Sequence, residues 1–175
     1  TRKVGVFVVG VLVTSCNNEL QVAIEGELLT WHKITLEVPG PALSEQGNPN
    51  PFLDYRLEAV FTNGSDSFRV PGYFAADGSA AETSAASGQY WRVHFAPDRP
   101  GTWSYVISFR KGRGIAVSDD PVAGEPLPAD GLTGTFEVSE TDKSGRDFRG
   151  KGRLEKHGHY LVHAASGEVF LKGGA

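Results

Sequence analysis

The chain has 175 residues, enough for one ordinary domain with a sizeable core. Its formal net charge of -4 gives no general attraction for phosphate backbones, so we expect no nucleic-acid partner. The sequence contains 22 glycines, 10 prolines and no methionine, and it has few stretches with helical periodicity. This composition favours many short strands joined by turns.

The first sixteen residues have the pattern of an export signal. Arg2 and Lys3 precede an apolar run, Val4 to Val13, that is too short for a transmembrane helix of about 20 residues. The run ends in Val13-Thr14-Ser15-Cys16, which is similar to a bacterial lipobox. We therefore predict a lipid attached to Cys16 and an exported lipoprotein anchored to a membrane, in the periplasm or at the cell surface. The alternative is a buried strand that holds a free cysteine.

Residues 28–140 show the alternation of half-buried strands. Inward positions at every second residue predict three strands, with Tyr55, Leu57, Ala59 and Phe61 in the first, Trp91, Val93 and Phe95 in the second, and Trp103, Tyr105, Ile107 and Phe109 in the third. Turn sequences such as Asn63-Gly64 and Asp77-Gly78 separate the predicted strands. Two stretches, 39–51 and 119–131, are predicted to be irregular loops. The pattern predicts an all-β, antiparallel sandwich.

The segments on either side of residues 28–140 are divided by composition. Residues 17–27 are predicted to be a tether, residues 141–151 a charged linker, and residues 152–175 a meander of three short strands at 153–156, 159–163 and 168–171. The meander ends in an apolar strand with no closing polar segment, so we expect the native chain to continue beyond Ala175. Because Thr1 is not a methionine, we also expect a few residues to precede it.

Several motifs occur together in an order that resembles a known family. They are Asn48 to Asp54, Val70 to Phe74 with Asp77-Gly78, Tyr90 to Phe95, Pro100 to Tyr105, and Gly152 to Leu154 leading to Phe170 to Gly173. In this order they are similar to the immunoglobulin-like N-terminal domain of unknown function that precedes predicted (β/α)8-barrel glycoside hydrolases in bacterial lipoproteins. The resemblance covers residues 28–175. It implies an immunoglobulin-like sandwich, a catalytic barrel later in the same chain, and a polysaccharide substrate for that barrel.

The residues themselves do not identify a catalytic site. Glycoside hydrolysis needs two carboxylates held on a rigid scaffold, and Asp119-Asp120 lie side by side in a predicted loop. His157, His159 and His163 allow the hypothesis of a complete zinc enzyme. On one extended strand, however, the backbones of His159 and His163 would be about 13 Å apart, too far for two ligands of one ion. We predict no catalytic residue in this part of the chain, no metal and no cofactor.

Three aromatic residues are candidates for contact with a carbohydrate or with another domain. Trp31 is placed by parity on the face opposite Ile34, while Tyr73 and Tyr90 are candidates for exposed contacts. The leading hypothesis is a non-catalytic accessory domain that braces the catalytic barrel of a surface-anchored glycoside hydrolase or shapes its polysaccharide cleft. The alternative is an independent carbohydrate-binding or adhesive module, which would need a row of aromatic side chains on one exposed face.

Overall fold

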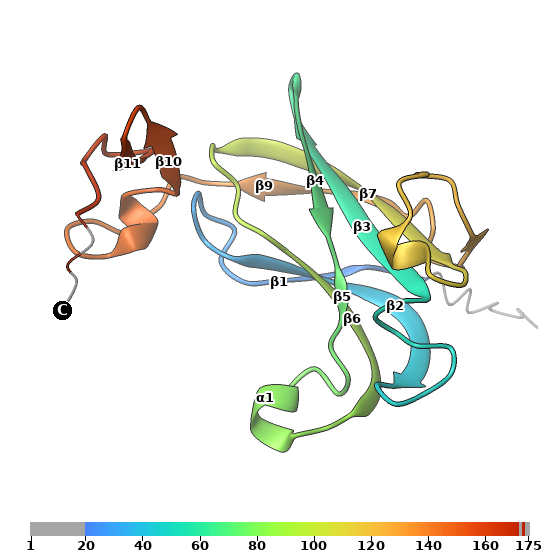
Figure 1. The fold of residues 1–175 in the computed structure, drawn as a ribbon. Coiled ribbons are helices and arrows are strands. Elements are labelled where there is room, and N and C mark those ends of the chain that lie inside the picture. Colours follow the sequence, from blue (N-terminus) through green and yellow to red (C-terminus); the bar gives the residue numbers. More distant parts are fainter. Residues whose placement is uncertain (1–19, 172, 174–175) are drawn as a thin grey trace, which may run out of the picture.

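The computed structural model describes residues 20–171 and residue 173, and these form a sandwich of two antiparallel sheets (Figure 1). The first sheet has the order β1 (Ala23–Glu25), β2 (Ile34–Ser44), β6 (Ser87–Phe95), β5 (Tyr73–Phe74). The second sheet has the order β4 (Asp66–Pro71), β3 (Tyr55–Asn63), β7 (Gly101–Lys111), with β8 (Glu125–Pro126) and β9 (Thr133–Val138) both paired to β7. The predicted all-β sandwich is therefore confirmed.

Helical structure is limited to short segments. They are α1 (Ala80–Thr83) and two 3-10 turns, η1 (Ile115–Val117) and η2 (Phe148–Gly150). Within residues 20–171, no helix is long and apolar enough to cross a membrane.

The core lies between the two sheets and is built by the predicted alternation of side chains. Trp91 of β6 packs against Phe109 of β7 with ring centroids 4.8 Å apart, and Phe61 of β3 stacks on Phe95 of β6 at 4.1 Å. These pairs join one sheet to the other. Because aromatic side chains bury large apolar areas, they supply much of the driving force for folding.

β2 is longer than the sequence predicted, because it continues through Pro39 and Gly40 to Ser44 with a change of register. A side chain at Gly40 would place its Cβ 2.3 Å from Cδ1 of Trp91, so only glycine lets the strand pass over this indole. The Trp91 indole N–H donates to the Pro41 carbonyl at 3.1 Å. Part of the predicted loop 39–51 is therefore strand.

The second predicted loop is held in place by two arginines of the second sheet. The Arg56 guanidinium donates to the carbonyls of Ser118 and Pro121, at 3.0 and 2.8 Å. The Arg110 guanidinium donates to the carbonyls of Ala123 and Gly124, at 2.9 and 2.8 Å. These charge-assisted bonds fix the long segment between η1 and β9 on the end of the sandwich.

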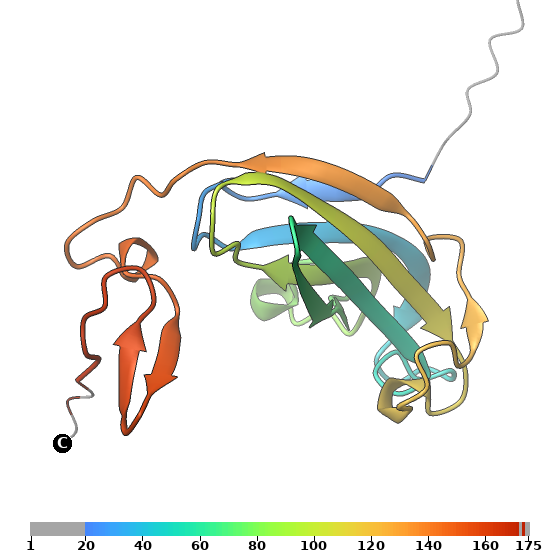
Figure 2. The ribbon, with the colours of Figure 1, turned by 90° about the horizontal axis from the view of Figure 1, so that it is seen from above.

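A separate hairpin of β10 (Leu154–His157) and β11 (Tyr160–His163) follows the sandwich. It lies beyond one end of the two sheets (Figure 2). The predicted third strand is reduced to an isolated bridge between Val162 and Val169, so the prediction of a three-stranded meander is wrong in that part. We call this end of the sandwich the hairpin end. The opposite end carries the loops 45–54 and 112–131, and we call it the loop end.

Candidate functional site

The outer face of the first sheet brings together two of the three aromatic residues that the sequence singled out. Tyr73 of β5 lies opposite Arg92 of β6, and Tyr90 precedes Arg92 by two positions on the same strand. Side chains two positions apart on a strand point to the same face, so both tyrosines and Arg92 share the outer surface. Tyr73 is 43% exposed, and Tyr90 is half-buried.

Polar contacts fix the side chains of this face. The Tyr73 hydroxyl lies 2.9 Å from Nε2 of His94, and Nδ1 of the same ring lies 2.9 Å from the Thr35 hydroxyl. The Arg92 guanidinium donates to the Glu37 carboxylate at 3.0 Å and lies 5.5 Å from the centre of the Tyr90 ring. The surface is therefore preorganised before any ligand arrives.

A shallow hollow of about 290 Å³ opens beside Tyr90 on this face. Three of the residues that line it are polar, Gln21, Glu37 and Gln89, and the others are Ala23, Val38, Pro39, Gly40 and Tyr90. An aromatic ring bordered by amides and a carboxylate can stack on an apolar sugar face and hydrogen-bond to hydroxyl groups. The hollow has the chemistry of a sugar contact, with neutral and acidic hydrogen-bonding groups around one ring.

His94 makes this face sensitive to pH. Burial lowers the pKa of His94 below its usual value, and the positive charges of Lys33 and Arg92 lower it further. A histidine whose pKa is lower in the folded state binds its proton more readily when unfolded, so stability falls as pH drops through about 6.5 toward the folded-state pKa. We expect the unfolding midpoint of the wild type to fall more steeply between pH 7 and 5 than that of His94→Gln. Parallel pH profiles of the two proteins would contradict this prediction.

Trp31 lies elsewhere, at the junction of the sandwich and the hairpin. It precedes β2, and its φ of 65° interrupts the extended backbone, so the parity argument that placed it on a sheet face is wrong. Its backbone N–H donates to the Pro97 carbonyl at 2.7 Å. A Cβ on Gly152 would lie 3.1 Å from its indole, and the Arg153 guanidinium lies 6.0 Å from its ring. Trp31 therefore packs against the start of the hairpin segment.

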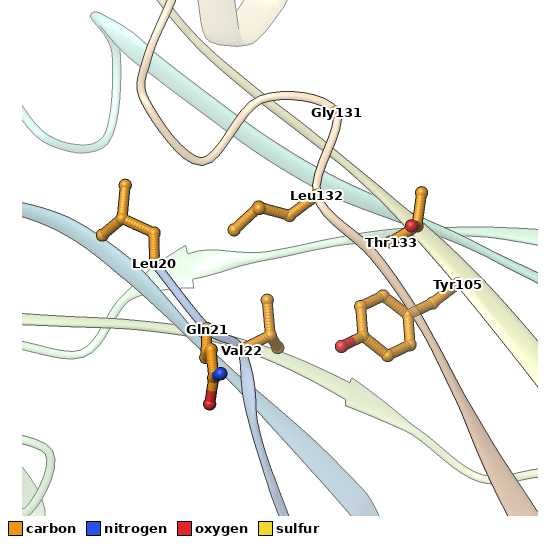
Figure 3. A pocket seen from close by; sticks show the side chains of 7 residues that line it. All are labelled: Leu20, Gln21, Val22, Tyr105, Gly131, Leu132 and Thr133. Carbon is orange, nitrogen blue, oxygen red and sulfur yellow. The ribbon is translucent and has the colours of Figure 1, made fainter. Parts of the chain in front are cut away.

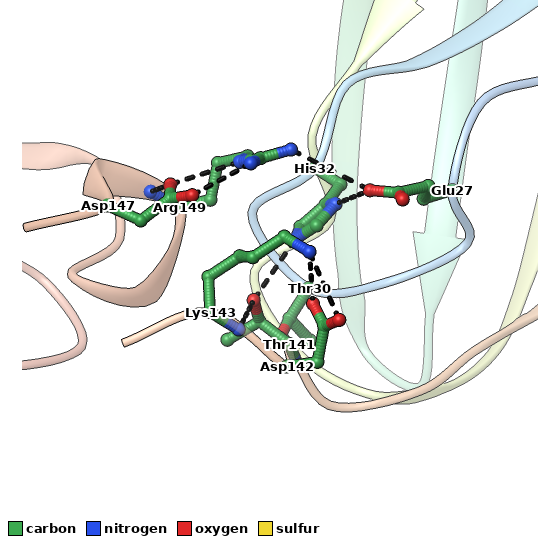
Figure 4. A network of polar contacts seen from close by, with 8 residues as sticks. All are labelled: Glu27, Thr30, His32, Thr141, Asp142, Lys143, Asp147 and Arg149. Carbon is green, nitrogen blue, oxygen red and sulfur yellow. Dashed lines mark hydrogen bonds and ion pairs between the residues drawn. The ribbon is translucent and has the colours of Figure 1, made fainter. Parts of the chain in front are cut away.

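A polar network beside Trp31 joins the segment that follows β9 to the segment that precedes β2 (Figure 4). His32 is buried, and its Nδ1 lies 2.6 Å from the Glu27 carboxylate while its Nε2 lies 3.0 Å from the Thr141 hydroxyl. Thr141 also donates its backbone N–H to the Thr30 hydroxyl at 2.9 Å. The buried His32 imidazole thus contacts a residue, Thr141, that lies 109 positions later in the chain.

The same network reaches the first turn of the segment that leads to the hairpin. Arg149 lies 3.7 Å from the Glu27 carboxylate and donates to Asp147 at 2.7 Å. Hydrogen bonds from the Arg149 side chain and from its backbone N–H lower the pKa of Asp147 to about 2. The predicted linker 141–151 therefore contacts the sandwich segment at two points, through the hydrogen bonds of Thr141 and the ion pair of Arg149 with Glu27. These contacts position the hairpin.

A second hollow borders the start of the described chain (Figure 3). It is lined by Leu20, Gln21, Val22, Tyr105, Gly131, Leu132 and Thr133. Burial raises the pKa of the Tyr105 phenol, so this hydroxyl keeps its proton at neutral pH. The lining contains no carboxylate or imidazole, and the Tyr105 phenol is its one titratable side chain.

The remaining candidate residues are not brought together. His163 is buried with its Nδ1 3.4 Å from the Gly152 carbonyl, whereas His157 and His159 are exposed at the tip of the hairpin. Within residues 20–171, no three histidine, cysteine or acidic side chains are placed to hold a metal ion. Asp119 and Asp120 are exposed in the loop end. Cys16 lies outside the described residues.

The sequence did not reveal the residues that join the sandwich to the hairpin. His32, Glu27 and Thr141 belong to no motif, and no spacing rule relates positions so far apart. The only available signal was the lone histidine next to Trp31 at the start of a strand, and this signal does not identify its partners.

Comparisons with known proteins place the fold but not the activity. No curated protein matches the chain. A solved structure from Bacteroides vulgatus, described as a "putative glycoside hydrolase", superimposes with a TM-score of 0.51 at 22% sequence identity. The match covers 83% of this chain and 21% of the other, so the chain spans about a fifth of the length of that protein. Residues 27–110, from the Glu27 network through most of β7, match the family described as domain of unknown function DUF5060.

Proposed function

We propose that this chain is the non-catalytic N-terminal accessory domain of a surface-anchored glycoside hydrolase, and that its hairpin braces the catalytic barrel. The matched structure supports this proposal, because the part similar to this chain is about a fifth of a protein described as a "putative glycoside hydrolase". The predicted lipid on Cys16 would anchor the whole enzyme to a membrane. Polysaccharide would then be the substrate of the parent enzyme, through residues beyond this chain.

The observation that carries the proposal is the apolar surface of the hairpin. Leu154, Leu161 and Val169 are between 41% and 48% exposed, and Leu171 is 84% exposed. Leu154 and Leu161 share one face of the hairpin, because they belong to paired strands at positions of the same parity. A two-stranded hairpin is marginal in water without a partner for such a face.

Hydrogen exchange tests the bracing role directly. We expect the amides of β10 and β11 to exchange quickly in the 175-residue chain and slowly in the longer native protein, while the amides of β6 and β7 stay protected in both. Leu161→Ala should speed exchange of the hairpin only in the longer protein, where we expect it to remove about 2–5 kcal/mol of packing. Leu57→Ala, in the sandwich core, is the matched control and should act in both proteins. Equal protection of the hairpin in the two proteins would contradict the proposal.

The hollow beside Tyr90 favours a second function, that of an independent carbohydrate-binding module. It offers one aromatic ring with Gln21, Glu37 and Gln89 around it, and Tyr73 lies on the same face. Binding of the 175-residue chain to a soluble or insoluble polysaccharide, lost in Tyr90→Ala and kept in Tyr160→Ala on the hairpin, would favour this function. Retention of full binding in Tyr90→Ala would exclude the hollow as the site.

A further inference from the structure

The loop end of the sandwich displays an exposed apolar surface that the proposed function does not use. Its members are Phe52, Leu53, Val117 and Val122, with exposed fractions of 53%, 45%, 78% and 71%. We call these four residues the apolar tip. They come from two loops, 45–54 and 112–131, that lie next to each other at the right of Figure 1. Large apolar side chains gathered at one end of a domain are typical of an interaction surface.

Hydrogen bonds hold the two loops of the apolar tip together. The Ala116 N–H donates to the Leu53 carbonyl at 3.0 Å, which joins one loop to the other. The Asn50 side chain accepts the backbone N–H groups of Phe52 and Leu53, at 2.8 and 3.1 Å. The Asp54 carboxylate accepts the Gly114 N–H at 2.9 Å. These bonds fix the loop backbone that carries the exposed side chains, so binding would not have to order that backbone.

The described chain begins toward this same end. β1 runs antiparallel to β2, which starts at the hairpin end, so residues before Ala23 lead away from the hairpin. Leu20 lines a hollow together with Gly131 and Leu132, where the loop 112–131 returns to the sheet (Figure 3). Only three residues separate Leu20 from Cys16, a span of at most about 14 Å when fully extended. A lipid on Cys16 would hold the loop end close to the bilayer.

Charges at the loop end favour an uncharged lipid surface over an anionic one. The Arg56 and Arg110 guanidiniums are bound to carbonyls of the loop, and Lys111 lies 3.4 Å from the Glu125 carboxylate. Asp119 and Asp120 lie in the same loop as Arg113. This surface has no surplus of positive charge of the kind that anionic lipids attract.

We propose that the apolar tip inserts into the surface of the membrane that anchors the chain, so that Phe52, Leu53, Val117 and Val122 contact lipid. The proposal rests on the anchoring of the proposed function. Four apolar side chains bind a bilayer weakly by themselves, but a tether of this length raises their local concentration at the surface. The protein would then be held to the membrane by two contacts, the acyl chains on Cys16 and the apolar tip.

The experiment uses the mature chain that begins at Cys16, coupled through this single cysteine to a maleimide lipid in phosphatidylcholine vesicles. This coupling does not depend on acylation in the native host, so it separates the apolar tip from the lipobox. Phe52→Trp and Val117→Trp place a reporter in the tip, and Tyr160→Trp, which is 65% exposed on β11, is the control at the other end. Fluorescence is read with lipids brominated near the headgroup, after subtraction of the signal of the unsubstituted chain.

We expect both tip tryptophans to be quenched and blue-shifted on vesicles, and the Tyr160→Trp signal to be unchanged. Adding Val122→Ser to Phe52→Trp should reduce the quenching, because it removes part of the inserted surface. Equal quenching of the tip and hairpin reporters would mean that the chain lies on its side, and no quenching of the tip would mean that it stays above the lipid. Either result overturns the proposal, and neither depends on whether Cys16 is acylated in the host.

Discussion

Replacing Trp91 by alanine is expected to lower the free energy of unfolding by about 3–5 kcal/mol, the usual cost of removing a buried tryptophan. The indole is 1% exposed and packs against Phe109, Phe74 and Tyr55, with ring centroids 4.8, 5.1 and 5.4 Å away. It also covers Gly40 and donates to Pro41. Its removal would leave a cavity between the sheets and would free the bulged part of β2.

Denaturant unfolding, followed by circular dichroism, measures this loss. Val106→Ala is the matched control, because Val106 lies on the outer face of β7, is 48% exposed and should change stability by at most about 0.5 kcal/mol. A loss below about 1 kcal/mol for Trp91→Ala would mean that the indole does not fill the space between the sheets.

Changing Cys16 to serine is expected to move the protein from the membrane fraction to the soluble fraction in the native host. Serine accepts no thioether-linked lipid, and the apolar tip alone gives only weak binding. Ser15→Ala keeps a small residue before the cysteine and should leave the protein with the membranes. The measurement is fractionation followed by a high-salt wash. A Cys16→Ser protein that still sediments with washed membranes would contradict the lipobox interpretation.

The strands and the core could be predicted because they follow a local rule. Alternation with a period of two places Trp91, Trp103 and Phe109 inside, and the structure leaves each of them at most 1% exposed. The turn at Asn63-Gly64 was equally local, since the Gly64 φ of 60° suits the residue that the sequence provides. The finer assignment of an immunoglobulin-like topology stays a prediction.

What could not be predicted depends on contacts between distant residues or on a single backbone angle. The prediction for Trp31 assumed that the alternation of β2 continues toward the N-terminus. Trp31 itself has a left-handed backbone, so the alternation does not reach it. Gly40 resembles a loop residue until the indole above it is known. The third strand of the meander has the residues of a strand but makes a single bridge, which residue types alone do not determine.

The opposite positions of the apolar tip and the hairpin have a further consequence, which concerns the height of the hairpin above the membrane. β7 extends through 11 residues along the sandwich, or about 36 Å at ~3.3 Å per residue. With the apolar tip on lipid, the hairpin would stand at roughly that height, several times the Debye length of about 8 Å at physiological ionic strength. A substrate arriving at the hairpin end would then be beyond the electrostatic influence of the lipid headgroups. Under the proposed function, the charge of the membrane would then not select between acidic and neutral polysaccharides at that end.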